Sequence, residues 1–262
     1  MDANIAALYR YPVKGLSPEP LERVSLSPGE CLPQDRRFAI ALPTTAFDPE
    51  QPEWLAKTHF IMLMRDQKLA QLLTRFDAET GMFSVEWSGE RVLEARLTEA
   101  DGKQAVGAFF TRFLDGIVAG PLRVVVAEGH AFADARPKPN ASTDQYVSLI
   151  NRTSIAALEE AVGVAVDPLR FRANAYFDGS PAWAELDWLG REIHLGTARL
   201  RVIAAITRCA ATEVNPDTAE RDLDVVGALR RHFGHNLMGI YAEVAEAGAV
   251  AVGDALTLPT PS

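Results

Sequence analysis

The sequence predicts a mainly β protein with a few helices, an α+β fold, arranged in two domains. Apolar and polar residues alternate in several short stretches, which is the period of half-buried strands. Helical spacing of apolar residues is confined to three short segments. A polar stretch without apolar periodicity divides the chain near its middle, and 262 residues are enough to bury two modest cores.

The N-terminal half has mainly the pattern of strands. The predicted strands are 24–26, 38–42, 83–87 and 93–97, with a glycine-containing hairpin turn at 88–90 between the last two. One helix is expected there, over 103–114, because Val106, Phe109, Phe110 and Phe113 are spaced to give one apolar face.

We place the domain boundary at the polar segment that begins at residue 128, so that the domains span 1–127 and 128–262. After it, Thr153 and Ser154 are expected to cap a helix that Gly163 ends, and Asp222 to cap a second helix. The predicted strands of this half are 171–177, 198–203, 240–244 and 249–258.

Composition excludes several classes of function. The formal net charge is -9 and the basic residues are scattered, so no nucleic-acid surface is expected. No stretch approaches the ~20 apolar residues that span a bilayer, and the N-terminus lacks a secretory signal, so we expect a cytoplasmic protein without membrane association. Cys31 and Cys209 are the only cysteines, which excludes a disulfide scaffold and a four-cysteine metal site.

The thiol of Cys209 is the first candidate for chemistry. It ends an apolar strand-like run, directly follows Arg208, and precedes the turn-rich segment 215–218. A neighbouring cation favours a reactive, ionised thiol, whereas a lone cysteine is more commonly a small core residue. The local sequence leaves both interpretations open.

Three groups of cations stand near predicted strand ends. They are Lys14 within 11–15, Arg36 and Arg37 within 35–38, and Arg172 within 172–174. Arginine and lysine that converge suit a phosphate, although each one alone is usually a solvated residue at a strand edge. His232 and His235 are spaced for one helical face, but without a third ligand we interpret them as structural. The sequence has no signature of a catalytic triad or of dinucleotide binding.

Several motifs resemble known families in order and spacing. Residues 207–209 (Thr-Arg-Cys), 212–217, 239–241 and 248–254 resemble the MOSC domain, the C-terminal domain of molybdenum cofactor sulfurases. Upstream, Tyr11-Pro-Val-Lys-Gly15 and residues 29–38 resemble the N-terminal β-barrel domain of amidoxime-reducing proteins. The resemblance spans nearly the whole chain. It implies a β-barrel-like N-terminal domain followed by a MOSC β-barrel with short helices.

This resemblance implies a molybdenum-pterin (molybdopterin) cofactor. In the family, the cysteine that corresponds to Cys209 supplies one sulfur to molybdenum, and the other sulfurs come from the pterin dithiolene; a soft thiolate suits this metal. The cations are expected to bind the pterin phosphate, together with free amides at the helix start near Thr153. Arg208 is expected to stabilise negative charge near the metal, or alternatively to form an ordinary surface ion pair. The implied cofactor contacts are Lys14, Gly15, Arg36, Thr153, Ser154, Arg172, Asn174, Thr207, Arg208 and Cys209.

The sequence departs from the family pattern at two places. Lys14 is followed by glycine where amidoxime-reducing relatives often carry serine, and residues 217–219 read Asp-Thr-Ala where glycine is common. No pyridoxal-phosphate domain precedes the MOSC-like part, so we do not expect desulfurase activity.

The function implied by the resemblance is two-electron reduction of N-hydroxylated or N-oxide substrates. Without a dinucleotide fingerprint or enough cysteines for an iron–sulfur cluster, the chain is expected to receive electrons from a ferredoxin-like or cytochrome-like donor and its reductase. One alternative is a carrier that holds the cofactor without turnover. Another is a two-domain protein whose MOSC-like half no longer binds the cofactor.

Overall fold

The structure is a computed structural model that describes residues 3–258. Its strands are β1 (Ala3–Arg10), β2 (Glu19–Leu21), β3 (Arg23–Leu26), β4 (Ala39–Ala41), β5 (Leu72–Phe76), β6 (Met82–Trp87), β7 (Glu90–Arg96), β8 (Arg123–Val125), β9 (Val147–Asn151), β10 (Ala175–Asp178), β11 (Glu192–Leu195), β12 (Ala198–Thr207), β13 (Leu237–Glu246), β14 (Gly248–Ala251) and β15 (Ala255–Thr257). The helices are α1 (Ala100–Phe113), α2 (Arg152–Val162) and α3 (Val225–Phe233), with short 3₁₀ helices η1 (Lys57–His59), η2 (Gln67–Gln71), η3 (Pro168–Phe171), η4 (Ala184–Trp188) and η5 (Ala210–Glu213). The α+β class is confirmed.

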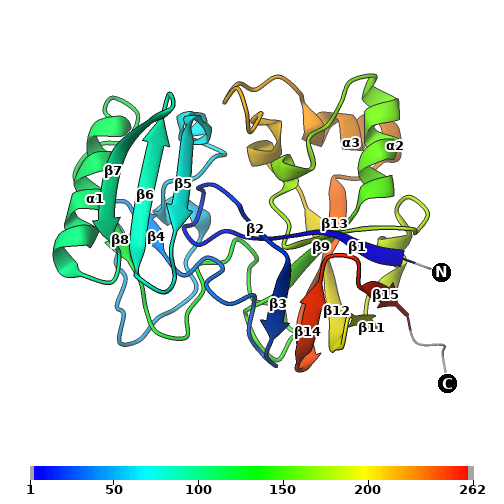
Figure 1. Cartoon of the computed structure of the whole chain (residues 1–262). Helices are drawn as coiled ribbons and strands as arrows, with labels where there is room; N and C mark the ends of the chain where they lie inside the picture. The colour runs from blue at the N-terminus through cyan, green and yellow to red at the C-terminus, as the bar shows by residue number, and fades with distance from the viewer. Residues whose placement is uncertain (1–2, 259–262) are drawn as a thin grey trace.

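Seven strands close into a barrel, the larger part of the molecule in Figure 1. The ring runs β1, β10, β9, β13, β12, β11, β15 and back to β1, and every pair except β9–β10 is antiparallel. The parallel pair is joined through α2, as a parallel connection requires a crossover. Gly239 in β13 shows how closely the ring packs, because an added Cβ would lie 2.4 Å from the carbonyl oxygen of Leu149 in β9.

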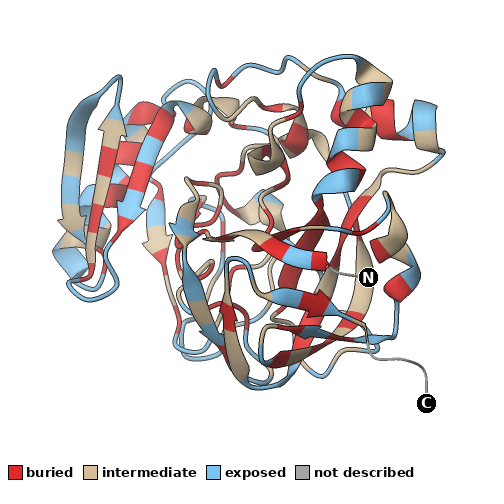
Figure 2. Ribbon diagram, turned by 45° about the vertical axis from the view of Figure 1, so that its right-hand side comes forward, coloured by how far each residue is buried: buried red, intermediate tan, exposed pale blue. Residues whose placement is uncertain are grey.

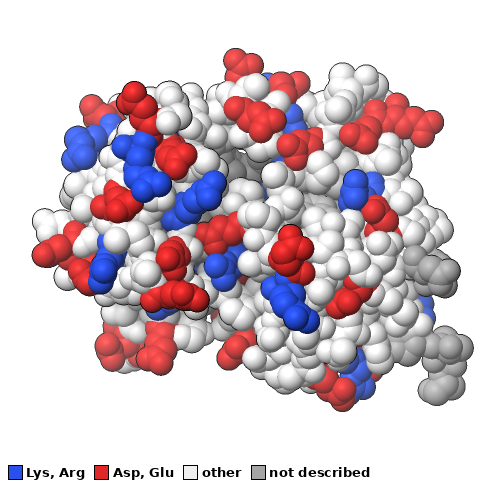
Figure 3. All heavy atoms as spheres, in the orientation of Figure 1, with Lys and Arg blue, Asp and Glu red and all other residues white. Residues whose placement is uncertain are grey.

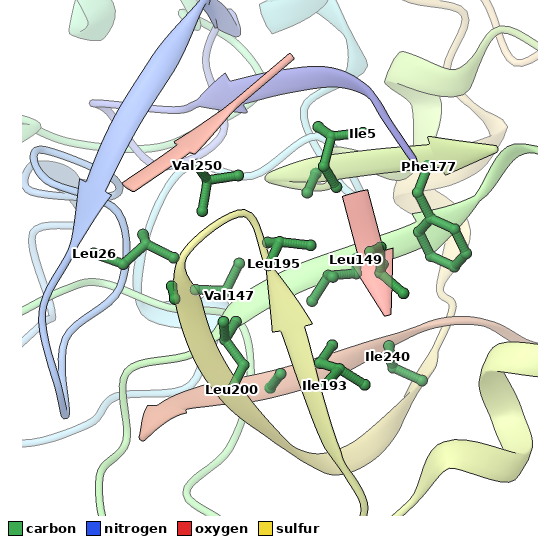
Figure 4. Close-up of a cluster of buried hydrophobic side chains, with 14 of the residues drawn as sticks. Ile5, Leu26, Val147, Leu149, Phe177, Ile193, Leu195, Leu200, Ile240 and Val250 are labelled. Atoms are coloured by element: carbon green, nitrogen blue, oxygen red, sulfur yellow. The ribbon is translucent and has the colours of Figure 1, made fainter. Parts of the chain in front are cut away.

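The barrel interior is filled by alternate residues of its strands. In β12, for example, Ala198, Leu200 and Val202 are buried and the residues between them are partly exposed. These side chains meet residues of β1, β9, β11 and β13 in one apolar cluster, part of which Figure 4 shows. This alternation is the reason that the sequence predicted strands at 198–203 and 240–244, and the structure confirms both.

The N-terminal part differs from the barrel expected from the resemblance. Its strands form an open three-stranded sheet, β5-β6-β7, and a separate pair, β4–β8, whose apolar faces are covered by α1. Two strands of the N-terminal part pair with strands of the C-terminal half instead: β1 lies in the C-terminal barrel and β3 pairs with β14. The predicted hairpin at 83–97 and the predicted helix are confirmed. The boundary at 127/128 stays a prediction, and β1 and β3 cross it.

The helices of the C-terminal half begin at different residues from those expected. Asn151, not Thr153 or Ser154, caps α2, because its side chain accepts from the Thr153 amide at 3.1 Å. Asp224, not Asp222, caps α3, accepting from the Gly227 amide at 2.7 Å. In both segments several cap-forming residues stand close together, so composition alone does not select one. No helix within residues 3–258 is long and apolar enough to cross a membrane.

Two predicted strands are shorter than expected. The run 171–177 begins with the end of η3, and Arg172 then takes a left-handed conformation (φ 54°), so that β10 starts only at Ala175. The Asp167 side chain accepts from the Leu169 amide and Pro168 opens η3, which favours a helical turn there. The run 249–258 divides into β14 and β15 around Gly253.

A buried carboxyl group links η4 to the start of α2. Glu185 is fully buried and accepts from the hydroxyl of Ser154 at 2.9 Å and from the side-chain Nδ2 of Asn151 at 3.3 Å. Burial raises the pKa of Glu185, although these hydrogen bonds lower it in part. Because the folded-state pKa lies above the unfolded one, the neutral group stabilises the fold at low pH, and this contribution is lost as pH rises through the folded pKa.

We therefore expect Glu185→Gln to gain stability relative to the wild type as pH rises above about 4, the ordinary range of a glutamate pKa. Glutamine cannot ionise, so it avoids the cost of a buried charge at neutral pH. Urea unfolding of both proteins between about pH 4 and pH 8 measures the difference in free energy of unfolding. A difference that does not change with pH would show that Glu185 does not titrate in this range.

Candidate functional site

A cavity of about 140 Å³ lies between the N-terminal part and one end of the barrel. It brings together residues from distant parts of the sequence. Of the residues predicted from the sequence, the cavity wall includes Arg36, Arg172, Asn174, Thr207, Arg208 and Cys209. Lys14 and Gly15 line a smaller adjoining cavity of about 40 Å³, whose wall also contains Arg172 and Cys209. Eight of the ten predicted residues therefore surround one connected site.

Cys209 lies just beyond the end of β12, where the chain turns into η5. Its carbonyl oxygen accepts from the amide of Thr212 at 3.0 Å and from the Thr212 hydroxyl at 2.9 Å, which fixes the turn. The thiol is half-buried, and the Nζ of Lys57 lies 3.0 Å from its Sγ. Lys57 belongs to η1 of the N-terminal part. Nothing in the sequence pairs it with a residue 152 positions away, and sequence analysis missed it.

Two arginines flank the ring of Tyr11 beside the cavity. The guanidinium carbons of Arg36 and Arg172 lie 5.0 and 4.4 Å from the ring centroid. Arg36 is paired with Asp35 and donates to the carbonyl oxygen of Arg172 at 3.2 Å. The guanidinium of Arg172, in contrast, donates no hydrogen bond to any residue that the structure describes, and burial lowers the pKa of this group. A cation without a partner on a cavity wall is suited to bind an anion.

The backbone of these two arginines is also unusual. Arg36 and Arg172 have φ values of 51° and 54°, in the left-handed region that residues with a side chain rarely adopt. Such conformations cost of order 1–3 kcal/mol and concentrate at functional sites, where surrounding contacts hold them. Here the strained turns direct both guanidinium groups onto Tyr11, which is fully buried and whose amide donates to Asp35 at 2.7 Å.

Lys14 provides a third positive charge and is itself buried. Its Nζ donates to the carbonyl oxygen of Phe132 at 2.9 Å and pairs with the carboxylate of Asp134, a residue not predicted from the sequence. Burial lowers the pKa of Lys14, and Asp134 opposes that effect. Burial alone would raise the pKa of Asp134, but Lys14 and Arg36 outweigh it and hold the pKa below its usual range. An anion that reaches Lys14 must share it with Asp134.

Arg208 and Asn174 are held by the protein itself. Arg208 does not form the surface ion pair that was the alternative for this residue. Its guanidinium donates to the carbonyl oxygens of Met238 (2.6 Å) and Phe171 (2.9 Å). Its charge lies at the cavity without a carboxylate partner among residues 3–258. The Asn174 side chain accepts from Ser148 at 2.8 Å and donates to the carbonyl oxygen of Tyr9 at 3.2 Å, joining β1 to the region of β9.

Thr153 and Ser154 do not lie at the site. The Thr153 amide is bound by Asn151, and the Ser154 hydroxyl bonds to Glu185 and accepts from the Trp183 amide at 2.8 Å. Neither residue lines the cavity around Cys209. The start of α2 therefore offers no free Thr153 amide or Ser154 hydroxyl to a phosphate there, and these two assignments from the resemblance are not supported.

The structure explains the departure from the family pattern at Gly15 but not the one at Ala219. Gly15 has a φ of 81°, and an added Cβ would lie 3.3 Å from the carbonyl oxygen of Ile61, so the backbone itself favours glycine. Ala219 has a φ of 60°, which glycine adopts without strain and alanine does not. The turn at 217–219 in this chain therefore places Ala219 in a strained backbone conformation.

The second cysteine lies close by but has a different environment. Cys31 also lines the cavity, yet its thiol is buried and lies 3.4 Å from the Oε1 of Gln145. Burial, with the nearby charge of Asp35, raises the pKa of Cys31 to about 12. At neutral pH it is therefore a thiol. His232 and His235 fall at the end of α3, and no group of three or more metal-ligating side chains of the His, Cys, Asp or Glu types occurs within residues 3–258.

Comparisons with known proteins agree with the resemblance. A family model, the MOSC domain, matches residues 129–257. Mitochondrial amidoxime-reducing component 1 of Homo sapiens is 27% identical over 191 residues, which cover 64% of this chain and 55% of that protein. The protein of the same name from Xenopus laevis is 30% identical over 136 residues, covering 47% of this chain and 36% of that protein. The molybdenum cofactor sulfurase of Anopheles gambiae is 29% identical over 129 residues, 42% of this chain and 16% of that protein.

The matches span only part of each relative, about half of the human protein and about a third of the frog protein. Among solved structures, the YUAD protein from Bacillus subtilis aligns with all of this chain and 98% of its own, at 14% identity and a TM-score of 0.45. Residues 129–257 therefore match the MOSC domain, and the chain is similar to the amidoxime-reducing components and to a molybdenum cofactor sulfurase.

Proposed function

We propose that this chain binds a molybdenum-pterin cofactor and that the Sγ of Cys209 is the one protein ligand of the metal. The observation that carries the proposal is that the half-buried thiol of Cys209 lines the same two adjoining cavities as Lys14, Arg36 and Arg172. The relatives named as amidoxime-reducing components and as a molybdenum cofactor sulfurase support the same class of function.

The residues present fit the two chemically distinct ends of such a cofactor. A thiolate is the soft ligand that metal–sulfur chemistry requires, and Cys31 is too strongly held as a thiol to compete. The terminal phosphate needs cations that bind it through several hydrogen bonds. The guanidinium of Arg172 donates no hydrogen bond to the described protein, and Arg36 and Lys14 lie near it.

The reaction that we propose is the two-electron reduction of N-hydroxylated or N-oxide compounds. For a hydroxylamine the balance is R–NH–OH + 2 e⁻ + 2 H⁺ → R–NH₂ + H₂O, so that the N–O bond breaks and an N–H bond forms. When bound, the cofactor supplies the two-electron redox chemistry and an open coordination position. Cys209 anchors it, Lys57 holds the sulfur in place, and the fixed charge of Arg208 favours negative charge in the cavity.

Metal and pterin analysis, followed by an activity assay, tests this proposal. Protein purified from a host that makes the cofactor should contain molybdenum and pterin, and should reduce a hydroxylamine when an artificial electron donor is supplied. Cofactor without turnover would favour a carrier, the second function that the same cavity could serve. Absence of both metal and pterin after exposure to free cofactor would contradict the binding proposal itself. The cytoplasmic location expected from the sequence stays a prediction.

The source of electrons gives a further expected result. The two cysteines cannot ligate an iron–sulfur cluster, and the sequence carries no dinucleotide fingerprint. We therefore expect NADH or NADPH alone to give no turnover, and a reductase with a ferredoxin-like or cytochrome-like carrier to restore it. Figure 3 shows charges of both signs interspersed on one face, which suits a small transient contact. Sustained reduction with NADPH and purified chain alone would contradict a separate donor.

A further inference from the structure

A second, larger cavity of about 330 Å³ forms an apolar groove between the two parts of the molecule. One wall comes from the N-terminal part and the other from η3 and the segment after η5. Its apolar wall residues include Leu16, Leu63, Leu69, Leu72, Leu169 and Val214. The surface is visibly hollowed between the two halves in Figure 3, and Figure 2 shows buried and exposed residues alternating along strands of the small sheet that contains β5. Volumes of this order with mostly apolar walls are typical of small-molecule sites.

The groove is continuous with the site around Cys209. The small cavity that contains Lys14 and Cys209 shares Leu63, Arg172 and Ala211 with the groove. Arg172 and Ala211 also line the cavity around Cys209, so the three spaces meet at these two residues. A molecule that lies in the groove can therefore place one end near the sulfur of Cys209.

The polar groups of the groove wall are largely satisfied within the protein. The hydroxyl of Ser17 donates to the carbonyl oxygen of Leu72 at 3.0 Å and accepts from the amide of Thr74 at 2.9 Å. There are two exceptions. No described residue accepts a hydrogen bond from the guanidinium of Arg172, at the inner end, and the buried Nε of Arg170 also has no partner among the described residues. The groove thus presents apolar walls along its length and positive charge at the end nearest Cys209, where Lys57 adds a second charge.

We propose that this groove binds the aliphatic chain of the substrate, with the N–O group at the Cys209 end. The inference rests on the proposed function and narrows its substrate class. A hydroxamic acid with an unbranched aliphatic chain is such a substrate, because its polar N–O group is at one end and its chain matches the apolar walls of the groove. The balance is R–CO–NH–OH + 2 e⁻ + 2 H⁺ → R–CO–NH₂ + H₂O, with the electrons supplied by the donor protein.

The test is a series of unbranched hydroxamic acids from acetohydroxamic to octanohydroxamic acid, reduced by the cofactor-loaded protein with an artificial donor. Full burial of a methylene group would lower KM about fourfold. The groove is open to solvent on one side, so we expect about twofold for each methylene, with little change in kcat. Calorimetric binding of the same series to the purified protein provides a readout that does not depend on turnover.

Variants on opposite walls of the groove locate the effect. Leu73→Ser and Leu169→Ser should each weaken the dependence on chain length severalfold and leave reduction of acetohydroxamic acid unchanged, since neither residue lines the Cys209 cavity. Leu189→Ser is the matched control, because Leu189 is 60% exposed and lies outside the groove. It should behave as the wild type does.

The outcomes separate this inference from the proposed function. If acetohydroxamic acid is reduced but KM and calorimetric affinity are the same for every chain length, the groove proposal is overturned and the proposed function stands. If binding strengthens with chain length and is weakened by Leu169→Ser, but no hydroxamic acid is reduced, the groove proposal is supported and the proposed reaction is overturned. Equal effects of Leu189→Ser and Leu169→Ser would also overturn the groove proposal.

Discussion

Replacing Cys209 by serine is expected to abolish retention of molybdenum while leaving the fold intact. A serine hydroxyl is far less acidic than a thiol, and its alkoxide is a harder ligand that suits this metal–sulfur chemistry poorly. The Cys209 side chain is half-buried on a cavity wall, so the change does not open the core. Metal analysis and thermal unfolding of Cys209→Ser measure the two effects separately.

Cys31→Ser is the matched control for this experiment. Cys31 lines the same cavity, but its raised pKa of about 12 keeps it protonated, and a hydroxyl can replace its contact with Gln145. We expect this variant to retain metal at the wild-type level. Equal loss of metal in the two variants would contradict a unique ligand at position 209.

Removing one cation of the cavity is expected to weaken retention of the cofactor about tenfold to a hundredfold. Each charged hydrogen bond to a buried phosphate contributes about 1.5–3 kcal/mol. Arg172→Gln is the cleanest variant, because the guanidinium of Arg172 bonds to no described residue and its loss breaks no internal pair. Loss of pterin and metal during extensive dialysis gives the measurement.

Lys14→Met and Arg36→Gln should show the same direction of effect. Each also leaves a carboxylate without its partner, Asp134 or Asp35, so their thermal unfolding must be measured alongside. Arg37→Gln is the control, since Arg37 bonds to Gln34 at 2.7 Å and does not line the cavity around Cys209. Full retention of cofactor by all three cavity variants would mean that the phosphate is bound elsewhere.

The sequence predicted those features that depend on local periodicity or on an ordered motif. Alternation at 198–203 identified β12 because one face of that strand is buried in the barrel, and Cys209 was found because it follows this strand in a recognisable motif. Local patterns failed where several residues compete for one role, as at Asn151, Thr153 and Ser154, where only the fold determines which caps α2. The predicted strand 171–177 is confirmed only over 175–177, because Phe171 ends η3 and Arg172 takes a left-handed conformation before β10 begins.

Features that depend on contacts between distant segments could not be predicted. Lys57 reaches Cys209 from η1, and Asp134 reaches Lys14 from the loop that follows β8, although neither has a sequence pattern that indicates its partner. The same holds for β1, whose alternation is compatible with a strand in either part. Its place in the C-terminal barrel follows from pairing with β10 and β15.

X-ray absorption at the molybdenum edge of the purified, cofactor-loaded wild-type chain tests the ligand assignment most directly. We expect one metal–sulfur single bond beyond those of the pterin dithiolene, present also in Cys31→Ser. Supplying Cys209→Ser with free cofactor at saturating concentration should give a metal environment that lacks this bond. Molybdenum with the same number of sulfur neighbours in Cys209→Ser as in the wild type would contradict the assignment of Cys209 as the ligand.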